Sequence, residues 1–517
     1  MKGNGIRRIA CFVLLAAALT GCHKVEDTQP AQESAAVENL RVIMMGTEPE
    51  EGMEELYEAL DALTIPDLNC RVRFTFVPWG NERKQLNIAV ASGEYDIIPG
   101  GVFSDYQIQI SRNAFLNLND YLYLVPELVE HYNYYSEDYL KQCEVDGGLY
   151  GIPQFDQGGL QHDNEGFFYR EDLRQKWGCP EIVSLETMEE YLYAAKQDSQ
   201  YQDEALITDN RIWQSLWIML AGDRYWEVGS MQETPLVVVS VDNPAVVLNR
   251  METPEFMMVL EYLKKWKQDG ILEADMLSLS DNEGGRGLEL ILSDRKPCET
   301  NVPVWSVGST YMRSLTMAHS DWTYGFFMYL SANGEYYRNE KNVKSALYVS
   351  SRTKYPETAV RFLEKIHTDQ RYFDLVRYGV EGIHYHNVDG AVSYEGIPAS
   401  NAFGMTVAGD RLLGRKYLSF NDQWTQVSDG IDAWREETLA VARENPISGY
   451  NFAAGGLERE INRLEAVRLQ YFQPLVCGYY DTPQDLEQAV ARLEQAGLAA
   501  YIEEIERQLG AYMGTDQ

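Results

Sequence analysis

The chain has 517 residues, of which 45% are hydrophobic and 24% are charged, so it carries enough apolar surface for large buried cores and is not disordered throughout. Its length predicts two to four domains. The 79 acidic side chains outnumber the 44 lysines and arginines, which gives a formal charge of −35 at pH 7. Because a surface of this sign repels phosphate backbones, nucleic acid is not an expected partner.

The first 22 residues predict export and attachment to lipid. Three basic residues among the first eight precede an apolar run at 9–19, which is too short to span a bilayer. The run ends in Leu-Thr-Gly-Cys, which resembles the lipobox of bacterial lipoproteins and implies acylation of Cys22. We therefore expect a signal peptide at 1–21 and a protein held by acyl chains such as palmitate at the extracellular face of the cell membrane. The alternative is an ordinary cleaved signal in which Cys22 has no such role.

Residues 22–39 have no apolar period and are rich in Glu, Gln, Ala and Pro, a composition typical of a flexible tether. Two of the seven cysteines, Cys11 and Cys22, belong to the leader, and the other five are far apart without a C-x-x-C pair. An odd number at such spacing favours buried free thiols over disulfides or a zinc site.

The segment after the tether predicts three strand–helix units. Short apolar or alternating runs predict strands over 40–46, 70–79 and 95–99, and helical spacing follows the first two at 53–63 and 81–93. Three such units in about 80 residues are typical of a parallel, doubly wound sheet. In such sheets ligands bind at the edge formed by the carboxyl ends of the strands.

Helix boundaries are well marked further along the chain. Thr253 and Pro254 provide an N-cap and a first-turn proline for a helix that ends before Gly270, and Pro356 begins another helix. The last hundred residues have almost wholly helical spacing. Helices there are expected to begin near Leu457, Pro483 and Leu498.

Five short segments stand out along the chain: VDGGLYGIP at 145–153, FYREDL at 168–173, LKKWKQDG at 263–270, PETA at 356–359 and YGVEGIHY at 378–385. Together, and in this order, they resemble motifs of the sugar-type extracellular solute-binding lipoproteins of bacterial ABC transporters (solute-binding family 1). The tail at 445–513 is similar to a C-terminal helical domain of uncharacterised role that such lipoproteins carry, usually in Gram-positive bacteria.

The resemblance implies an α/β fold with two discontinuous lobes of the periplasmic-binding-protein type (type II), a hinge cleft between them and a helical C-terminal extension. The expected ranges are 40–153 and 320–385 for the first lobe, 154–319 and 386–440 for the second, and 441–517 for the C-terminal helical domain. It also implies a monomeric carrier, not an enzyme, that needs no cofactor. Such a carrier captures a mono- or oligosaccharide by lobe closure and delivers it to separate permease subunits.

A sugar site needs aromatic platforms for C–H faces and carboxylates or amides for hydroxyls. Glu48, Trp79 and Asp156 are candidates because each follows a predicted strand. The second lobe would add Trp217, from an aromatic cluster, and Trp305, where the family tends to place a stacking aromatic. Tyr378 and Glu381, in the family-like turn, complete the candidate ligand-binding residues.

Each candidate has a structural alternative. Trp213 and Trp217, four residues apart, also fit a core stripe, and Trp79 and Trp305 lie beside turn residues. The remaining candidates have equally ordinary roles: a solvated loop charge for Glu48, a turn former for Asp156 and hinge packing for Tyr378 and Glu381.

Motifs of common enzyme classes are missing from the sequence, which contains no G-x-S-x-G, H-E-x-x-H or G-x-x-x-x-G-K-[ST]. His384 and His386 could share a strand face, but no third metal ligand at a useful spacing accompanies them, and no metal site is predicted. Three other functions remain open: a binding protein for a polyamine or cationic peptide, a surface glycan-active enzyme, and a sensor that presents its ligand to a receptor.

Overall fold

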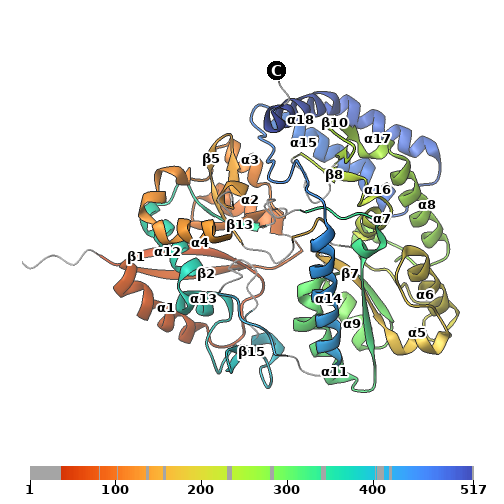
Figure 1. Ribbon diagram of the computed structural model, residues 1–517, viewed down its shortest axis with the longest axis horizontal. Coiled ribbons are helices and arrows are strands. Elements are labelled where there is room, and N and C mark those ends of the chain that lie inside the picture. The colour runs from red at the N-terminus through yellow and green to blue at the C-terminus, as the bar shows by residue number, and fades with distance from the viewer. Residues whose placement is uncertain are drawn as a thin grey trace, which may run out of the picture. The chain divides into compact units, whose positions relative to one another are not determined.

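The computed structural model describes residues 36–514 apart from 81, 102, 136–138, 155–158, 230–235, 280–283, 339–344, 402, 404–412 and 419–421. The signal peptide, Cys22, most of the tether and Asp156 lie outside the described residues, as does the side chain of Trp305. Residues 37–517 form one unit, and its architecture is shown in Figure 1.

The first lobe contains a five-stranded sheet with the order β2-β1-β3-β13-β6. Its strands are β1 (Glu38–Met45), β2 (Cys70–Val77), β3 (Ile97–Gly101), β6 (Gly151–Pro153) and β13 (Ser345–Val349). The first three strands are parallel, as the sequence predicted. The sheet as a whole is mixed, because β13 enters from the carboxyl edge of β3, with Ser345 opposite Gly101, and so runs antiparallel to its neighbours.

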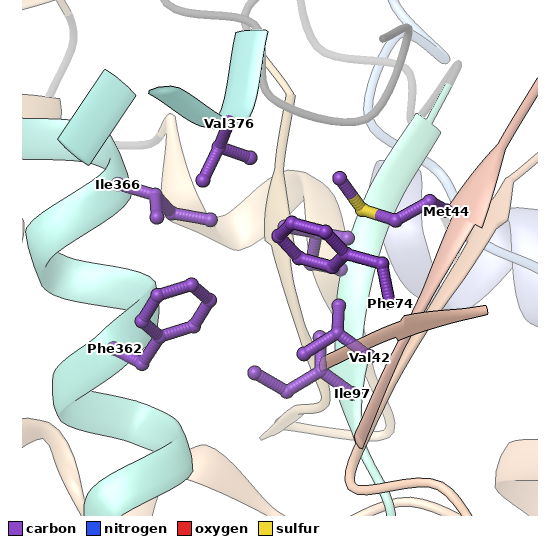
Figure 2. Close-up of a pocket in the computed structure, with 8 residues that line it drawn as sticks. Val42, Met44, Phe74, Ile97, Phe362, Ile366 and Val376 are labelled. Atoms are coloured by element: carbon purple, nitrogen blue, oxygen red, sulfur yellow. The ribbon is translucent and has the colours of Figure 1, made fainter. Parts of the chain in front are cut away.

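Helices from both ends of the lobe's sequence cover this sheet. They are α1 (Met53–Leu68), α2 (Glu82–Ser92), α3 (Tyr106–Ser111), α4 (Pro126–Tyr135), α12 (Pro356–Thr368) and α13 (Gln370–Arg377). In Figure 1 the teal α12 and α13 lie among the red and orange N-terminal elements. Figure 2 shows a small apolar cavity at this join, with Phe362, Ile366 and Val376 facing strand residues such as Val42 and Ile97.

The second lobe is built on a three-stranded antiparallel sheet with the order β11-β7-β12. β7 (Glu165–Arg170) lies between β11 (Cys298–Pro303) and β12 (Tyr324–Met328). A second sheet contains β8 (Tyr225–Glu227), β9 (Val237–Ser240) and β10 (Asn243–Asn249). The helices of this lobe are α5 (Glu171–Trp177), α6 (Leu185–Gln197), α7 (Ile212–Ala221), α8 (Pro254–Gln268), α9 (Gly284–Leu292), α10 (Val304–Ser306) and α11 (Arg313–Ala318), with a π-helical turn at Val307–Met312 between the last two.

The chain changes lobe later than the sequence led us to expect. β12 pairs with β7, so residues 324–328 belong to the second sheet, although a return to the first lobe was expected near residue 320. The hairpin of β14 (His386–Val388) and β15 (Ala391–Ser393) packs around Tyr378, directly after α13 of the first lobe. α14 (Asp422–Val441) returns to the second lobe and contacts β12.

The C-terminal helices share the hydrophobic core of the second lobe. They are α15 (Glu458–Val467), α16 (Gln473–Val476), α17 (Pro483–Ala496) and α18 (Leu498–Met513), with a π-helical turn at Arg468–Phe472. Phe472 lies 5.3 Å from Trp213 of α7 and 5.5 Å from Phe256 of α8, measured between ring centroids. This extension is therefore helical, as predicted, and it is continuous with the second lobe instead of having a core of its own.

Predicted helix boundaries are confirmed where a capping residue marks them. Thr253 accepts a hydrogen bond from the Phe256 amide at 3.3 Å, and Pro254 occupies the first turn of α8. Gly497 separates α17 from α18 with a left-handed φ of 113°. Across the described ranges, no helix has both the length and the apolar character needed to cross a bilayer.

Candidate ligand-binding site

The first lobe places a partly exposed ring, Trp79, at the carboxyl end of β2, against the buried ring of Phe103. Trp79 follows β2 and is partly buried, and its ring meets that of Phe103, which follows β3, edge-on with a centroid distance of 5.3 Å. Glu48 follows β1 and is exposed. Both Glu48 and Trp79 are thus at the strand ends where the sequence placed them. Rings and a carboxylate at one sheet edge match the chemistry of a sugar's C–H faces and hydroxyls.

The second lobe presents a polar cluster of Glu165, Asp209 and Arg211. Glu165 is the first residue of β7, and the other two immediately precede α7. Arg211 Nη2 lies 2.7 Å from Asp209 Oδ2, and Arg211 Nη1 lies 3.7 Å from Glu165 Oε1. The three side chains are 14–25% exposed, so these charges are paired with one another and still reach solvent. Such pre-oriented carboxylates and guanidinium groups can exchange hydrogen bonds with a polar ligand.

A buried ion pair supports this polar cluster from the core. Lys296 Nζ donates to Glu299 Oε2 and to Thr208 Oγ1, both at 2.8 Å, and the two charged side chains are 0% and 5% exposed. Burial raises the pKa of Glu299, and the neighbouring Lys296 opposes that rise. Because Thr208 adjoins Asp209, the lysine fixes the backbone that carries the cluster. Gly287 leaves room for the carboxylate, since a Cβ there would lie 1.6 Å from Glu299 Oε2.

Both clusters lie at the sheet ends that the crossing segments connect. Pro153, the last residue of β6, pairs with the second residue of β13, and β7 begins with Glu165 after the crossing. The outgoing and returning segments also pair with each other, since the Gln161 amide donates to the Tyr337 carbonyl oxygen at 3.0 Å. The returning segment is joined to a third one by a 2.9 Å hydrogen bond from the Arg338 amide to the Arg443 carbonyl oxygen.

Trp217 lies in the core and is not presented to a ligand. Its side chain is 1% exposed, and the buried Arg250 guanidinium carbon lies 4.6 Å from its ring centroid and 5.4 Å from that of Trp213. The physical reason is that α7, IWQSLWIMLA, is apolar on almost every side, and such a helix is buried all round. The core alternative considered for this pair is therefore the one that the structure supports.

Tyr378 packs in a small separate core. It is 2% exposed, lies among Phe373, Tyr385 and the hairpin residue Val392, and its hydroxyl accepts a 2.8 Å hydrogen bond from the Arg415 amide. Glu381, three residues on, is exposed. The packing alternative thus fits Tyr378, and no contact in the structure assigns a ligand role to Glu381.

His384 fastens the Tyr378–Tyr385 turn to the loop before α1. Its Nδ1 accepts a 2.8 Å hydrogen bond from the Val380 amide, and its Nε2 lies 3.0 Å from the Glu51 carbonyl oxygen. Burial lowers the pKa of this histidine, and the Glu51 carbonyl opposes that shift. Gly379 and Gly52 permit the close approach, because a Cβ at either would lie 2.6 Å or less from a neighbouring side-chain atom. The turn therefore positions the loop that carries Glu48.

The backbone of Trp305 is placed, whereas its side chain lies outside the described residues. It lies in α10 directly after β11, whose last residue, Pro303, pairs with Glu165. The chain at Trp305 therefore starts beside the polar cluster, and its ligand role stays a prediction, as does that of Asp156.

Phe103, Glu165, Asp209 and Arg211 were not singled out from the sequence. The available signal was a run of charged residues at 209–211 immediately before the most apolar helix of the chain. Glu165 gives no local signal, because sheet pairing alone brings it to Arg211.

The described residues contain no group of three or more His, Cys, Asp or Glu side chains arranged to hold a metal. The five described cysteines are free, and four of them are buried. Burial raises the pKa of the Cys70 thiol to about 12. These observations confirm the interpretation as buried thiols for four of the cysteines, whereas Cys179 is only partly buried.

Comparisons with known proteins agree with this architecture. Residues 446–514 match a family model described as a domain of unknown function, DUF3502. Over 494 residues the chain is 21% identical to a carbohydrate ABC transporter substrate-binding protein of Streptococcus pneumoniae serotype 4, with 94% of each chain covered. The chain is thus similar along almost its whole length to a protein with that name.

Solved structures show the same fold. The N-glycan transport solute-binding protein (NgtS) of Streptococcus pneumoniae, in complex with Man1GlcNAc, matches with a TM-score of 0.68 at 17% identity, covering 92% of this chain and all of the other. An HMO-binding solute-binding protein of Bifidobacterium longum infantis matches with a TM-score of 0.60 at 14% identity, covering 92% and 99%. The two-lobe α/β fold is thus confirmed. The chain's named relatives are binding proteins of transporters and not enzymes.

Proposed function

We propose that this protein is the external substrate-binding component of an ABC importer and that it captures a mono- or oligosaccharide. The observation that carries the proposal is the similarity over 94% of both chains to a protein named as a carbohydrate ABC transporter substrate-binding protein. The neighbours with bound or named glycans support the same ligand class. Chain-long similarity counts for more than any single motif because it includes both lobes and the crossings between them.

In this proposal the ligand lies between the two sheet edges. The Trp79 ring, backed by the buried Phe103, would stack on a C–H face of the sugar, and the polar cluster of Glu165, Asp209 and Arg211 would bond its hydroxyls. Contacts from both lobes stabilise a closed arrangement, which a permease can distinguish from the open one. Trp305 would add a stacking ring from the second lobe.

The proposal also includes a lipid anchor on Cys22 at the extracellular face of the cell membrane. The lipobox-like ending of the apolar run supports this anchor. Replacement of Cys22 by Ser should release the protein from the membrane fraction of a bacterium that expresses it. Retention of the Cys22→Ser protein in that fraction would refute the anchor without touching the ligand assignment.

A thermal-unfolding screen tests the ligand class. The purified protein is heated with Man1GlcNAc, milk oligosaccharides, alginate and malto-oligosaccharides, and separately with spermidine and a lysine-rich peptide. One sugar class should raise the midpoint, because a ligand at 100 times its Kd stabilises by about 2.7 kcal/mol. A rise with spermidine or the peptide alone would contradict the sugar assignment. Release of smaller sugars over hours would indicate a glycan-active enzyme instead.

A further inference from the structure

Residues 450–454, the strap, form a short segment before α15 that is bound to the last helix of the C-terminal domain. The side-chain amide of Gln508, on α18, accepts from the Ala453 amide and donates to the Ala453 carbonyl oxygen, both at 2.8 Å. Phe452 packs on Tyr501 of the same helix, with ring centroids 5.4 Å apart. Because α18 shares the second lobe's core, the strap moves with the second lobe.

The strap also reaches the first lobe, through the side chain of Asn451. Its Oδ1 accepts a 3.2 Å hydrogen bond from Tyr106 Oη. Its Nδ2 donates to the Gln142 carbonyl oxygen and, at 3.2 Å, to the Glu144 carbonyl oxygen. One amide side chain thus joins the second lobe to two separate segments of the first.

The first-lobe face of this contact contains buried polar atoms that it leaves unpaired. Gln107 Nε2, Gln142 Nε2 and Tyr348 Oη are buried and have no hydrogen-bond partner within the part of the chain that the structure describes. The Tyr348 ring stacks on that of Tyr106, with centroids 5.8 Å apart. Unpaired buried polar atoms destabilise the arrangement that buries them. Asn451 thus bonds to first-lobe segments whose buried polar groups are only partly satisfied in this arrangement, as expected of a contact that can be exchanged for another.

The contact lies beside the first-lobe ring pair and beside the segment that leads to the second lobe. Tyr106 begins α3, three residues after Phe103 of the first-lobe ring pair. Gln142 and Glu144 lead into the short strands that precede β6 and the outgoing crossing. Any rotation of the second lobe against the first must therefore stretch or break the bonds of Asn451.

We propose that Asn451 forms a releasable latch between the C-terminal domain and the first lobe, and that this latch sets the preferred angle between the lobes of the ligand-free protein. The inference rests on the lobe movement of the proposed function and gives the C-terminal domain a role in it. Ligand binding then competes with the latch, so that the domain tunes affinity without contacting the sugar.

Distances between spin labels test the latch in the absence of any sugar. Labels are attached to Ile88→Cys on α2 and Met258→Cys on α8, two exposed positions in different lobes, in the full chain with Cys11, Cys22 and Cys179 replaced by Ser. Asn451→Leu, of similar size but without hydrogen-bonding groups, should broaden the distance distribution and shift its mean. Asn243→Leu, at an exposed position on β10 of the second lobe, is the matched control and should leave the distribution as in the parent.

Two milder variants guard against a folding defect. Tyr106→Phe removes one bond of Asn451, and Asn451→Thr keeps one hydroxyl that can donate or accept, so both should shift the distribution in the same direction by less. The latch would be overturned if Asn451→Leu gave the same distance distribution as the parent. If Asn451→Leu does not fold, unchanged distributions in both milder variants would overturn it instead. A failed sugar screen would refute the ligand assignment and leave these ligand-free distances unaffected, which keeps the two results separate.

Discussion

The two sheet edges of the candidate site are held in place by different kinds of interaction. The first-lobe edge offers ring surface, Trp79 against Phe103, on loops at the ends of three parallel strands. The second-lobe edge offers paired charges, and these stand on a buried lysine–glutamate pair. One edge is thus supported by apolar packing and the other by a buried ion pair. Substitutions should therefore act differently at the two edges.

The largest expected effect lies beneath the second-lobe edge. Lys296→Met would leave the Glu299 carboxylate buried without its cation, and loss of one partner of a buried pair costs about 3–5 kcal/mol. Urea unfolding followed by circular dichroism measures the loss.

The matched control is Lys265→Met, because Lys265 forms a 2.9 Å pair with Glu189 while being 50% exposed. That substitution should cost about 0–1 kcal/mol. Equal losses in the two variants would show that the buried pair does not support the second-lobe edge.

The next effect concerns the ring edge. Trp79→Ala removes the stacking surface and should weaken binding of the sugar identified by the screen at least tenfold, or about 1.4 kcal/mol. Calorimetric titration gives the affinity. Tyr123→Ala, at an aromatic residue that is 73% exposed elsewhere in the first lobe, should bind as the parent does. Unchanged binding by Trp79→Ala would assign this ring to packing alone.

A smaller loss is expected at the polar edge. Arg211→Gln keeps hydrogen-bonding capacity but removes the charge paired with Asp209, and we expect roughly a fivefold to tenfold loss of affinity, or about 1 kcal/mol. Arg463→Gln, at a 65% exposed arginine of α15, is the control. If Arg211→Gln weakened binding more than Trp79→Ala, the charged edge would dominate recognition and the comparison would be reversed.

The sequence predicted the elements better than their assembly. Capping residues and apolar periods identified β1 to β3, α8 and α12, since these signals are local. The direction of β13 and the placement of β12 depend on pairings between residues more than 150 positions apart, which no local pattern encodes. Trp217 was a candidate ligand residue, yet the apolar character of α7 on almost every side favours the burial that the structure shows. Glu165 and Arg211 were not, because they meet only when the second sheet forms.

The first-lobe edge has a pH-dependent attachment at a buried histidine. His384 is held neutral, since burial lowers its pKa below the ordinary value of 6.5 and Nδ1 accepts from the Val380 amide. A lowered folded-state pKa means that stability is fully present above pH 6.5 and is lost as pH falls toward and through the folded pKa.

The free energy of unfolding should therefore decrease between pH 7 and pH 5, and the decrease should be shallower in His384→Gln. Urea unfolding at several pH values measures both slopes. His386→Gln, two residues on and partly exposed, should keep the parent's slope. A parallel pH dependence in His384→Gln and the parent would remove this histidine as the source.

The smallest effect is expected in the apolar support of the first-lobe edge. The cavity in Figure 2 lies between Val42, Phe74 and Ile97 of the sheet and Phe362, Ile366 and Val376 of the helices. Val376→Ile adds one methylene toward this space, keeps the β-branched shape and should raise the free energy of unfolding by about 0.5–1 kcal/mol. Val360→Ile, on α12 and 2% exposed but not part of the cavity lining, is the control and should be neutral or destabilising. A higher free energy of unfolding in Val376→Ile with unchanged sugar affinity would show that the ring edge tolerates tighter packing beneath it. Weaker sugar binding would show that the edge depends on the space in the cavity.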